Sequence, residues 1–247
     1  MNYNWNWQVF FALEPISSAS YLEYFLIGLG WTLLVAVPAW IIAISLGTVI
    51  AGFNVAGNKL VRFLCGAYIE IFRNIPPLVQ LFLWFFVVPE ILPFSLGELI
   101  KSIPIYLHSW LTAVLAIGLL ISSRMAEHIR SGINSLPSGQ WLASRSLGMG
   151  TYHTYKLVIL PQAFRVALPA LTSESVNTVK NTSLAMMIGV MEIMGRARSM
   201  QEITYQVFEP LMAATVIYVM INILVILLMH FVEKQTQIPG FIVKNKH

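Results

Sequence analysis

Residues 25–51 read FLIGLGWTLLVAVPAWIIAISLGTVIA and contain no charged side chain. A helix rises about 1.5 Å per residue, so roughly 20 apolar residues cross the ~30 Å hydrocarbon layer of a membrane. This stretch is long enough to do so. It therefore predicts a membrane-spanning helix.

Four more apolar stretches follow, at residues 60–92, 105–123, 176–194 and 211–232. Of the 247 residues, 57% are hydrophobic and 11% are charged, whereas an ordinary soluble domain has about 25% charged residues. We therefore expect an all-α integral membrane protein, a bundle of five transmembrane helices that forms a single domain over residues 1–247. The composition leaves no room for a second, soluble domain.

The charges between these stretches predict an orientation, because cytoplasmic loops carry an excess of Lys and Arg. The segments after the first, third and fifth stretches hold nine basic residues, and the alternate segments hold three. We therefore expect the N-terminus outside and the C-terminus in the cytoplasm. The nine are Lys59, Arg62, Arg130, Arg145, Lys156, Arg165, Lys234, Lys244 and Lys246, and the three are Lys101, Arg196 and Arg198.

The second stretch contains a predicted break. Arg73 and Asn74 come shortly before the pair Pro76-Pro77. Paired prolines lack backbone N–H donors and disfavour the helical conformation of the residue before them. The sequence therefore predicts that the second span breaks or kinks near Pro76, where irregular backbone survives only if protein covers it or it lines a wet cavity.

Residues 125–170 are too polar to span and too apolar for a disordered loop. We expect the third helix to continue past the bilayer and two short helices to follow against the inner membrane face. The first, residues 140–147, stops at Gly148, and the second stops at Pro161. Pro169 is expected to open the fourth span.

Sequence signatures of catalysis are missing. The chain has no G-x-x-x-x-G-K-[ST] and no H-E-x-x-H, so it predicts neither a P-loop for ATP nor a zinc protease site. The five histidines are scattered, and Cys65 is the only cysteine, which argues against a metal site or a disulfide. We therefore expect no enzyme activity and no cofactor on this chain.

The most specific signal is a spaced motif in the predicted inner loop. It resembles the "EAA" loop of ABC importer permeases, in which Glu-Ala-Ala, three residues and Gly are followed nine residues later by a β-branched residue, one further residue and Leu-Pro. In that family this loop forms a coupling helix that docks on a separate ATPase subunit. The chain departs from the pattern by having Leu in place of Glu and Ser in place of the second Ala. The residues concerned are Leu142, Ala143, Ser144, Gly148, Val158, Leu160 and Pro161, with Arg145 expected at the rim of the contact.

Further stretches resemble the permease subunits of polar amino-acid ABC importers. These are FRNIPPLVQ at 72–80, INSLPSGQ at 133–140 and NTVKNTSL at 177–184, while NWNW at 4–7 and VPEILP at 88–93 are similar to glutamate/aspartate permeases. The resemblance covers nearly the whole chain. It implies a multi-pass protein of the bacterial inner membrane. It also implies partners: ATPase subunits that bind ATP and Mg²⁺, a second permease subunit, and an extracytoplasmic amino-acid-binding protein.

Ionisable groups inside spans are costly and usually face a cavity or a partner, so they are candidates for the substrate pathway. Arg124 ends the apolar part of the third stretch. Arginine binds carboxylates in a two-pronged geometry, so Arg124 is a candidate to bind the side-chain carboxylate of an acidic amino acid. The alternative is that Arg124 extends to the inner membrane interface or pairs with Glu127 or Glu174. Arg73 and Asn74 either line the pathway or form hydrogen bonds to backbone groups that lose their partners because of the two prolines.

A polar stripe in the fourth stretch completes the candidates. Its members recur at three- and four-residue spacing, which places them on one helix face. They either line the pathway or bond a neighbouring helix. The stripe consists of Ser173, Asn177, Lys180 and Asn181.

Two functions remain open at this point. The first is a permease subunit of an ATP-driven importer of polar amino acids, with L-glutamate and L-aspartate favoured. The second is a stand-alone secondary transporter or channel for a small polar solute, although many such transporters contain repeated halves and five unpaired spans provide none.

Overall fold

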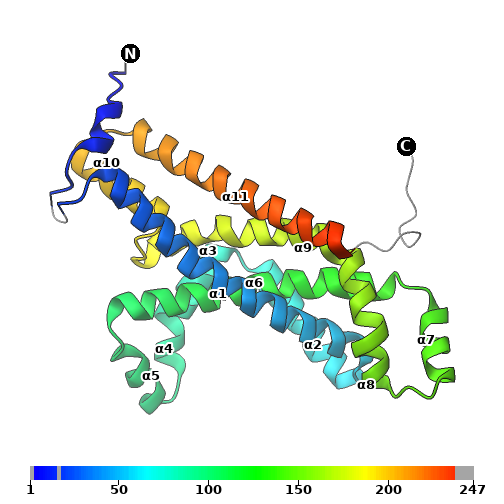
Figure 1. The fold of residues 1–247 in the computed structure, drawn as a ribbon. Coiled ribbons are helices and arrows are strands. Elements are labelled where there is room, and N and C mark those ends of the chain that lie inside the picture. The colour runs from blue at the N-terminus through cyan, green and yellow to red at the C-terminus, as the bar shows by residue number, and fades with distance from the viewer. Residues whose placement is uncertain (1–2, 16–17, 237–247) are drawn as a thin grey trace.

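The computed structural model describes residues 3–15 and 18–236, so Lys244 and Lys246 of the charge count lie outside it. Apart from an isolated bridge between Leu13 and Ser20, the described residues form helices and connections only. The all-α prediction is therefore confirmed for this part of the chain (Figure 1).

Three helices are long and apolar enough to cross a membrane: α1 (Tyr21–Ala56), α6 (Ile105–Asn134) and α11 (Phe208–Thr236). Ser20 begins α1 with a capping box, in which its side chain accepts a hydrogen bond from the Glu23 N–H and the Glu23 side chain accepts one from the Ser20 N–H. Such a cap satisfies two donors that the first helical turn leaves free. The structure therefore has candidate membrane spans at three of the five predicted places.

The predicted break in the second span is also confirmed. Helix α2 (Lys59–Asn74) and the segment from Pro77 to Ile91 are bent by 107° and together count as one candidate span. The second arm consists of α3 (Pro77–Phe82), the π-helical η2 (Leu83–Val87) and α4 (Val88–Ile91). The short α5 (Phe94–Lys101) connects it to α6.

Gln80 stabilises this bend. Its Nε2 atom donates to the carbonyl oxygens of Phe72, at 2.7 Å, and Ile75, at 2.8 Å. In an uninterrupted helix the Phe72 carbonyl would accept from the N–H of residue 76, which proline lacks. The side chain of Gln80, only 3% exposed, therefore supplies a hydrogen bond that the backbone cannot make.

The fourth predicted span is wrong in its bounds. The structure has α9 (Leu160–Asn181), then the 3-10 helix η4 (Thr182–Ile188), a turn at Gly189, and α10 (Ile193–Thr204). Residues 176–194 thus contain the end of α9, η4, a turn and the first residues of α10, and they are not one helix. Gly189 has a φ of +87°, a conformation that glycine adopts without a Cβ clash.

The two prolines of this region also differ from expectation. Pro161 does not stop a helix, because α8 (Thr151–Thr154) continues through the π-helical η3 (Tyr155–Ile159) into α9. Pro161 lies in the first turn of α9, directly after a π-turn that already interrupts the regular hydrogen bonding, so its missing N–H is tolerated there. Pro169 lies inside α9 and does not open it.

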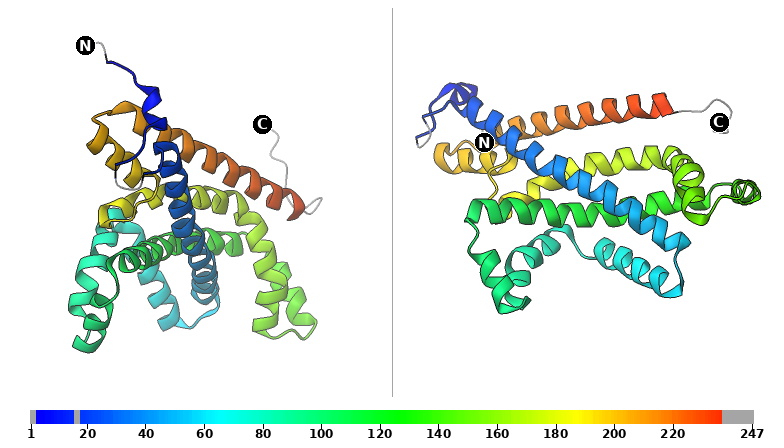
Figure 2. Two further views of the ribbon diagram at one scale, coloured as in Figure 1. Left: turned by 60° about the vertical axis from the view of Figure 1, so that its left-hand side comes forward. Right: turned by 60° about the horizontal axis from the view of Figure 1, so that its bottom comes forward.

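The core is formed by α1, α6 and α9. Residues of these helices, such as Ala39, Ile121 and Ala167, form the main cluster of buried apolar side chains. Figures 1 and 2 show that α1 and α11 begin close together and then diverge, that α1 crosses α6, and that α9 lies between α11 and α6. The 3-10 helix η1 (Trp7–Phe11) and α10 lie near the start of α1.

Candidate substrate and coupling sites

A charged hollow of about 340 Å³ is lined by Arg73, Arg124, Glu127, His128 and Glu174. Its volume is at the lower end of the ~300–1,000 Å³ of ordinary small-molecule sites. Arg73 belongs to α2, Glu174 to α9, and the other three to α6. The bend after α2 and the packing of α6 on α9 therefore bring together residues from three helices.

Arg124 and His128 both face Glu174 across this hollow. The Arg124 Nη1 atom lies 3.9 Å from the Glu174 Oε2, and the His128 Nε2 atom lies 3.5 Å from Oε1. The Glu174 side chain is only 9% exposed, whereas that of Arg124 is 32% exposed. Of the two alternatives for Arg124, the pair with Glu174 is observed, and the exposed part of the guanidinium still faces the hollow.

Arg73 has a different environment. It is exposed, and within residues 3–15 and 18–236 no carboxylate lies within 4.0 Å of its guanidinium. Glu127, its neighbour in the hollow, is held by Arg130 through bonds of 3.0 and 2.6 Å. The lining itself holds two arginines and two glutamates, and Arg130, which binds Glu127 from outside the lining, adds one further positive charge at the rim.

The other predicted pathway residues do not line this hollow. Asn74 donates to the backbone and side chain of Glu70, at 2.8 and 3.1 Å, so it neither lines the hollow nor bonds the backbone freed by the prolines. Ser173 is exposed, and its hydroxyl lies 3.5 Å from the Pro169 carbonyl oxygen. Asn177 reaches the edge of the site, because its Nδ2 lies 3.4 Å from Glu174 Oε2.

Lys180 lines a second hollow, of about 360 Å³, which we call the Lys180 hollow. Ser183 and Tyr218 contribute polar atoms to it, and the remaining lining is Leu184, Met186, Met187 and Met194. Asn181 faces a separate small space beside Pro77 and donates to the Asn177 carbonyl at 2.8 Å. The predicted polar stripe of the fourth span is thus divided among several environments.

Four residues of the charged hollow and of the bend were not among the predicted site residues: Glu127, His128, Glu174 and Gln80. Glu174 is an acidic residue near an apolar stretch, which marks it as a candidate for a functional site, but the sequence points to it only as a partner of Arg124. Nothing in the sequence except its position four residues after Pro76 indicates a role for Gln80, because that role depends on the geometry of the bend.

The predicted coupling residues form a separate site at the end of the molecule away from the N-terminus, where α7 (Ser138–Ser146) and α8 project (Figure 1). We call residues 138–161 the coupling segment. One face of α7 packs inward: the Trp141 and Tyr155 rings meet edge to face at 4.9 Å, and Ser144 is buried. Gln162 of α9 also donates to the Gln140 side chain at 3.4 Å.

The opposite face of α7 is open. Leu142 is 68% exposed and Leu147 is 81% exposed, and Ala143 and Arg145 lie on the same exposed side. Gly148 ends the helix with a φ of +77°, which a residue with a Cβ adopts only at a cost. Of the later motif residues, Val158 and Leu160 are half-buried against the core and Pro161 is exposed.

Comparison with known proteins identifies the family. The family model described as "Binding-protein-dependent transport system inner membrane component" matches residues 22–238. The chain belongs to this family. It is therefore a multi-pass component of an inner membrane transport system, and the family resemblance seen in its sequence is confirmed.

Individual relatives agree with this assignment. The chain is 34% identical over 241 residues to the "Glutamate/aspartate import permease protein GltJ" of Escherichia coli (strain K12), covering 97% of this chain and 98% of the relative. It is 33% identical over 216 residues to GltK, a glutamate/aspartate import permease protein of Escherichia coli O6:H1, covering 87% and 94%. A solved structure, "Crystal structure of an amino acid ABC transporter with histidines", is 30% identical with a TM-score of 0.73 and covers 91% and 99%.

Proposed function

We propose that this chain is the permease subunit of an ATP-driven importer of polar amino acids, with glutamate and aspartate as its substrates. The observation that carries the proposal is the projecting coupling segment, whose exposed face presents Leu142 at an end of a membrane bundle. A protein that transports alone has no need of an exposed apolar side chain at this place, whereas a motor subunit would cover it. ATP and Mg²⁺ would then bind to that separate ATPase, and this chain would not be an enzyme.

The coupling segment is connected to the charged hollow through α9. Tyr155, which packs on Trp141 of α7, belongs with Ile159 to the same buried cluster as Ala163 and Ala167 of α9, and Glu174 follows two turns later. Close-packed cores transmit displacements because they do not compress. Closure of the ATPase subunits would shift α7 and, through α9, alternate the hollow between two states that bind the solute differently.

The acidic substrate class is supported by the charged hollow and by relatives. Arg73, which forms no ion pair among the described residues, lines the hollow together with Arg124, and its free guanidinium favours a carboxylate over a cationic side chain. The relatives GltJ and GltK carry glutamate/aspartate in their names, but a structure described with histidines is almost as similar. Competition of unlabelled amino acids against radiolabelled glutamate uptake tests this choice: histidine competing better than aspartate would contradict it.

Five spans, with the N-terminus outside and the C-terminus in the cytoplasm, complete the proposal. The coupling segment and the last turns of α11 lie at the end of the molecule opposite to the start of α1, in keeping with an odd number of crossings (Figures 1 and 2). On this orientation the segment faces the cytoplasm. Helix α9 would be the fourth span in chain order, although Arg165, Glu174 and Lys180 make it less apolar than the other candidates.

We also propose the remaining partners. An extracytoplasmic binding protein, which the family description names in general, would deliver the amino acid. A second permease chain would complete the pathway, since the charged hollow lies open on one side of this chain and two differently named permeases resemble it.

Reconstitution tests the proposed function. Vesicles that contain this chain with its co-purifying subunits should accumulate glutamate only with ATP, binding protein and the ATPase present. The alternative, a stand-alone secondary transporter or channel, predicts uptake by the purified chain alone. Uptake without the ATPase would therefore contradict the proposal.

A further inference from the structure

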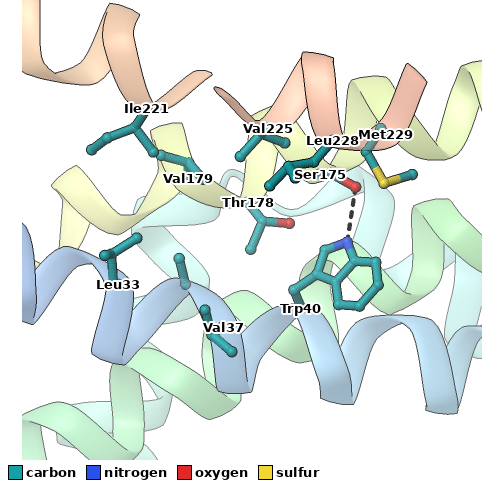
Figure 3. A pocket seen from close by; sticks show the side chains of 11 residues that line it. Leu33, Val37, Trp40, Ser175, Thr178, Val179, Ile221, Val225, Leu228 and Met229 are labelled. Atoms are coloured by element: carbon teal, nitrogen blue, oxygen red, sulfur yellow. Dashed lines mark hydrogen bonds between the residues drawn. The ribbon is translucent and has the colours of Figure 1, made fainter. Parts of the chain in front are cut away.

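An apolar groove of about 190 Å³ lies between α1, α9 and α11. Figure 3 shows Leu33, Val37 and Trp40 of α1 facing Val225 and Met229 of α11, with Thr178 of α9 at the back. The groove is a consequence of the fold, because α1 and α11 diverge from their common starting point and leave a wedge between them (Figures 1 and 2). The charged hollow and the Lys180 hollow share none of its lining residues.

The polar atoms on the wall of this groove are already hydrogen-bonded within the protein. Trp40 Nε1 donates to Ser175 Oγ at 2.8 Å, as Figure 3 shows, and Ser175 Oγ donates to the Leu171 carbonyl at 2.8 Å. Thr178 Oγ1 donates to the Glu174 carbonyl at 2.8 Å. Water or a polar solute would gain few hydrogen bonds here, and apolar cavities of about 150 Å³ stay dry and accept apolar molecules.

The groove also lies at membrane depth. Its residues occupy the middle of α1 and the second half of α11, which are both candidate spans, and only 11% of the apolar window of α11 is buried. Val37 and Leu228, at the edges of the groove, are 53% and 57% exposed. In an inner membrane protein, such an opening faces the hydrocarbon chains of lipids.

The size of the groove selects among possible occupants. A helix of a partner protein is about 10–12 Å in diameter and does not fit a space of 190 Å³. A single flexible hydrocarbon chain does fit, and it would restore the van der Waals contacts that diverging helices lose. We propose that the groove binds one acyl chain of a membrane phospholipid, which fills the wedge between α1 and α11. This inference needs only the membrane location and not the proposed substrate.

Photo-crosslinking tests the proposal. The complete importer complex is placed in nanodiscs of phosphatidylethanolamine and phosphatidylglycerol that carry a diazirine in the middle of the acyl chain, and labelled peptides are identified by mass spectrometry. We expect label to concentrate at Val225 and Met229, well above the label on the outward-facing Val219 of the same helix. Val37→Trp, which places a large side chain in the groove, should remove most of the label from Val225 and Met229.

The matched control is Val219→Trp, because Val219 is 49% exposed, similar to Val37 at 53%, but does not line the groove. It should leave the groove label unchanged. A uniform distribution of label along the exposed face of α11 would indicate ordinary surrounding lipid and would overturn the proposal. This comparison needs only the wild-type protein. Absence of lipid label at Val225, with crosslinks to a protein chain, would also overturn it.

Discussion

The Nη1 atom of Arg124 lies 3.9 Å from the Glu174 Oε2, so a charge pair connects α6 to α9 on the wall of the charged hollow. The pair is asymmetric, because Glu174 is nearly buried and Arg124 remains partly open to the hollow. Glu174 thereby holds Arg124 in place, and the exposed part of the guanidinium is left to contact a solute.

Replacing Arg124 tests this arrangement. Arg124→Leu should lower glutamate uptake, per amount of assembled complex, roughly ten- to a hundredfold, since hydrogen bonds to charged groups contribute about 1.5–3 kcal/mol. Glutamate uptake by Arg124→Lys should lie between that of Arg124→Leu and that of the wild type, because lysine keeps the charge but lacks the two-pronged geometry. The measurement is the initial rate of radiolabelled glutamate uptake at several concentrations.

A double variant distinguishes binding of the solute by Arg124 from a structural role of Arg124 as the partner of Glu174. If the loss arose only because Glu174 is left without its arginine, Arg124→Leu combined with Glu174→Gln would recover uptake. We expect no such recovery, and recovery would remove Arg124 from the substrate pathway.

Arg73→Gln should weaken uptake of acidic amino acids without impairing assembly. Arg73 faces the hollow and, among the described residues, has no ion pair, so its removal leaves no buried carboxylate unpaired. We expect the KM for glutamate to rise about tenfold. Arg198→Gln is the matched control: Arg198 forms only an exposed pair with Glu202 at 3.1 Å, and such pairs contribute little. Equal effects of the two variants would contradict the role of Arg73.

Gln80→Leu should destabilise the protein, because the carbonyls of Phe72 and Ile75 lose their hydrogen bonds at the bend. Leaving buried polar groups unpaired costs about 1–3 kcal/mol each, which a thermal unfolding midpoint of the detergent-solubilised complex would record as a clear decrease. Gln201→Leu is the control, since Gln201 makes one exposed bond to the Val207 carbonyl at 2.6 Å. An unchanged midpoint for Gln80→Leu would show that the bend does not depend on this side chain.

Leu142→Ala should weaken binding of the ATPase. Fully burying a leucine contributes about 1.5–3 kcal/mol, so loss of most of it should lower affinity roughly tenfold. Leu99→Ala is matched in exposure, at 63% against 68% for Leu142, but lies on α5, away from the coupling segment. Co-purification of the ATPase at graded detergent concentration measures both variants. The account fails on this point if Leu99→Ala weakens the complex as much as Leu142→Ala does.

Much of the fold was predictable because apolar length and proline pairs act locally. The spans that became α1, α6 and α11, and the break before Pro77, follow from the lack of charge and from missing backbone donors. The fourth span was misplaced because the apolar run of residues 182–194 continues past the end of α9. A hydrophobicity pattern does not distinguish one continuous helix from a 3-10 helix that ends in a turn at Gly189 and is followed by a new helix.

The site was predictable only in part. Arg73 and Arg124 were found because intramembrane charge is rare, and the structure brings them into one hollow. Asn74, Ser173 and Lys180 shared the same signal but lie elsewhere, since which neighbour a polar side chain meets depends on how α2, α6 and α9 pack. The coupling segment was predicted by its spacing, whereas its continuity through Pro161 depends on the π-turn of η3.

The central claim is that the exposed face of α7 docks on a separate ATPase. Because Cys65 is the only cysteine, a Cys65→Ala, Leu142→Cys chain carries one thiol, at the centre of the proposed contact. Reaction with a short bifunctional crosslinker in inner membrane vesicles, followed by mass spectrometry, identifies what lies within reach of residue 142. The account predicts a crosslink to an ATP-hydrolysing subunit, with a yield that changes when ATP is added. A thiol that reacts only with lipid-soluble reagents and never with another protein would contradict it.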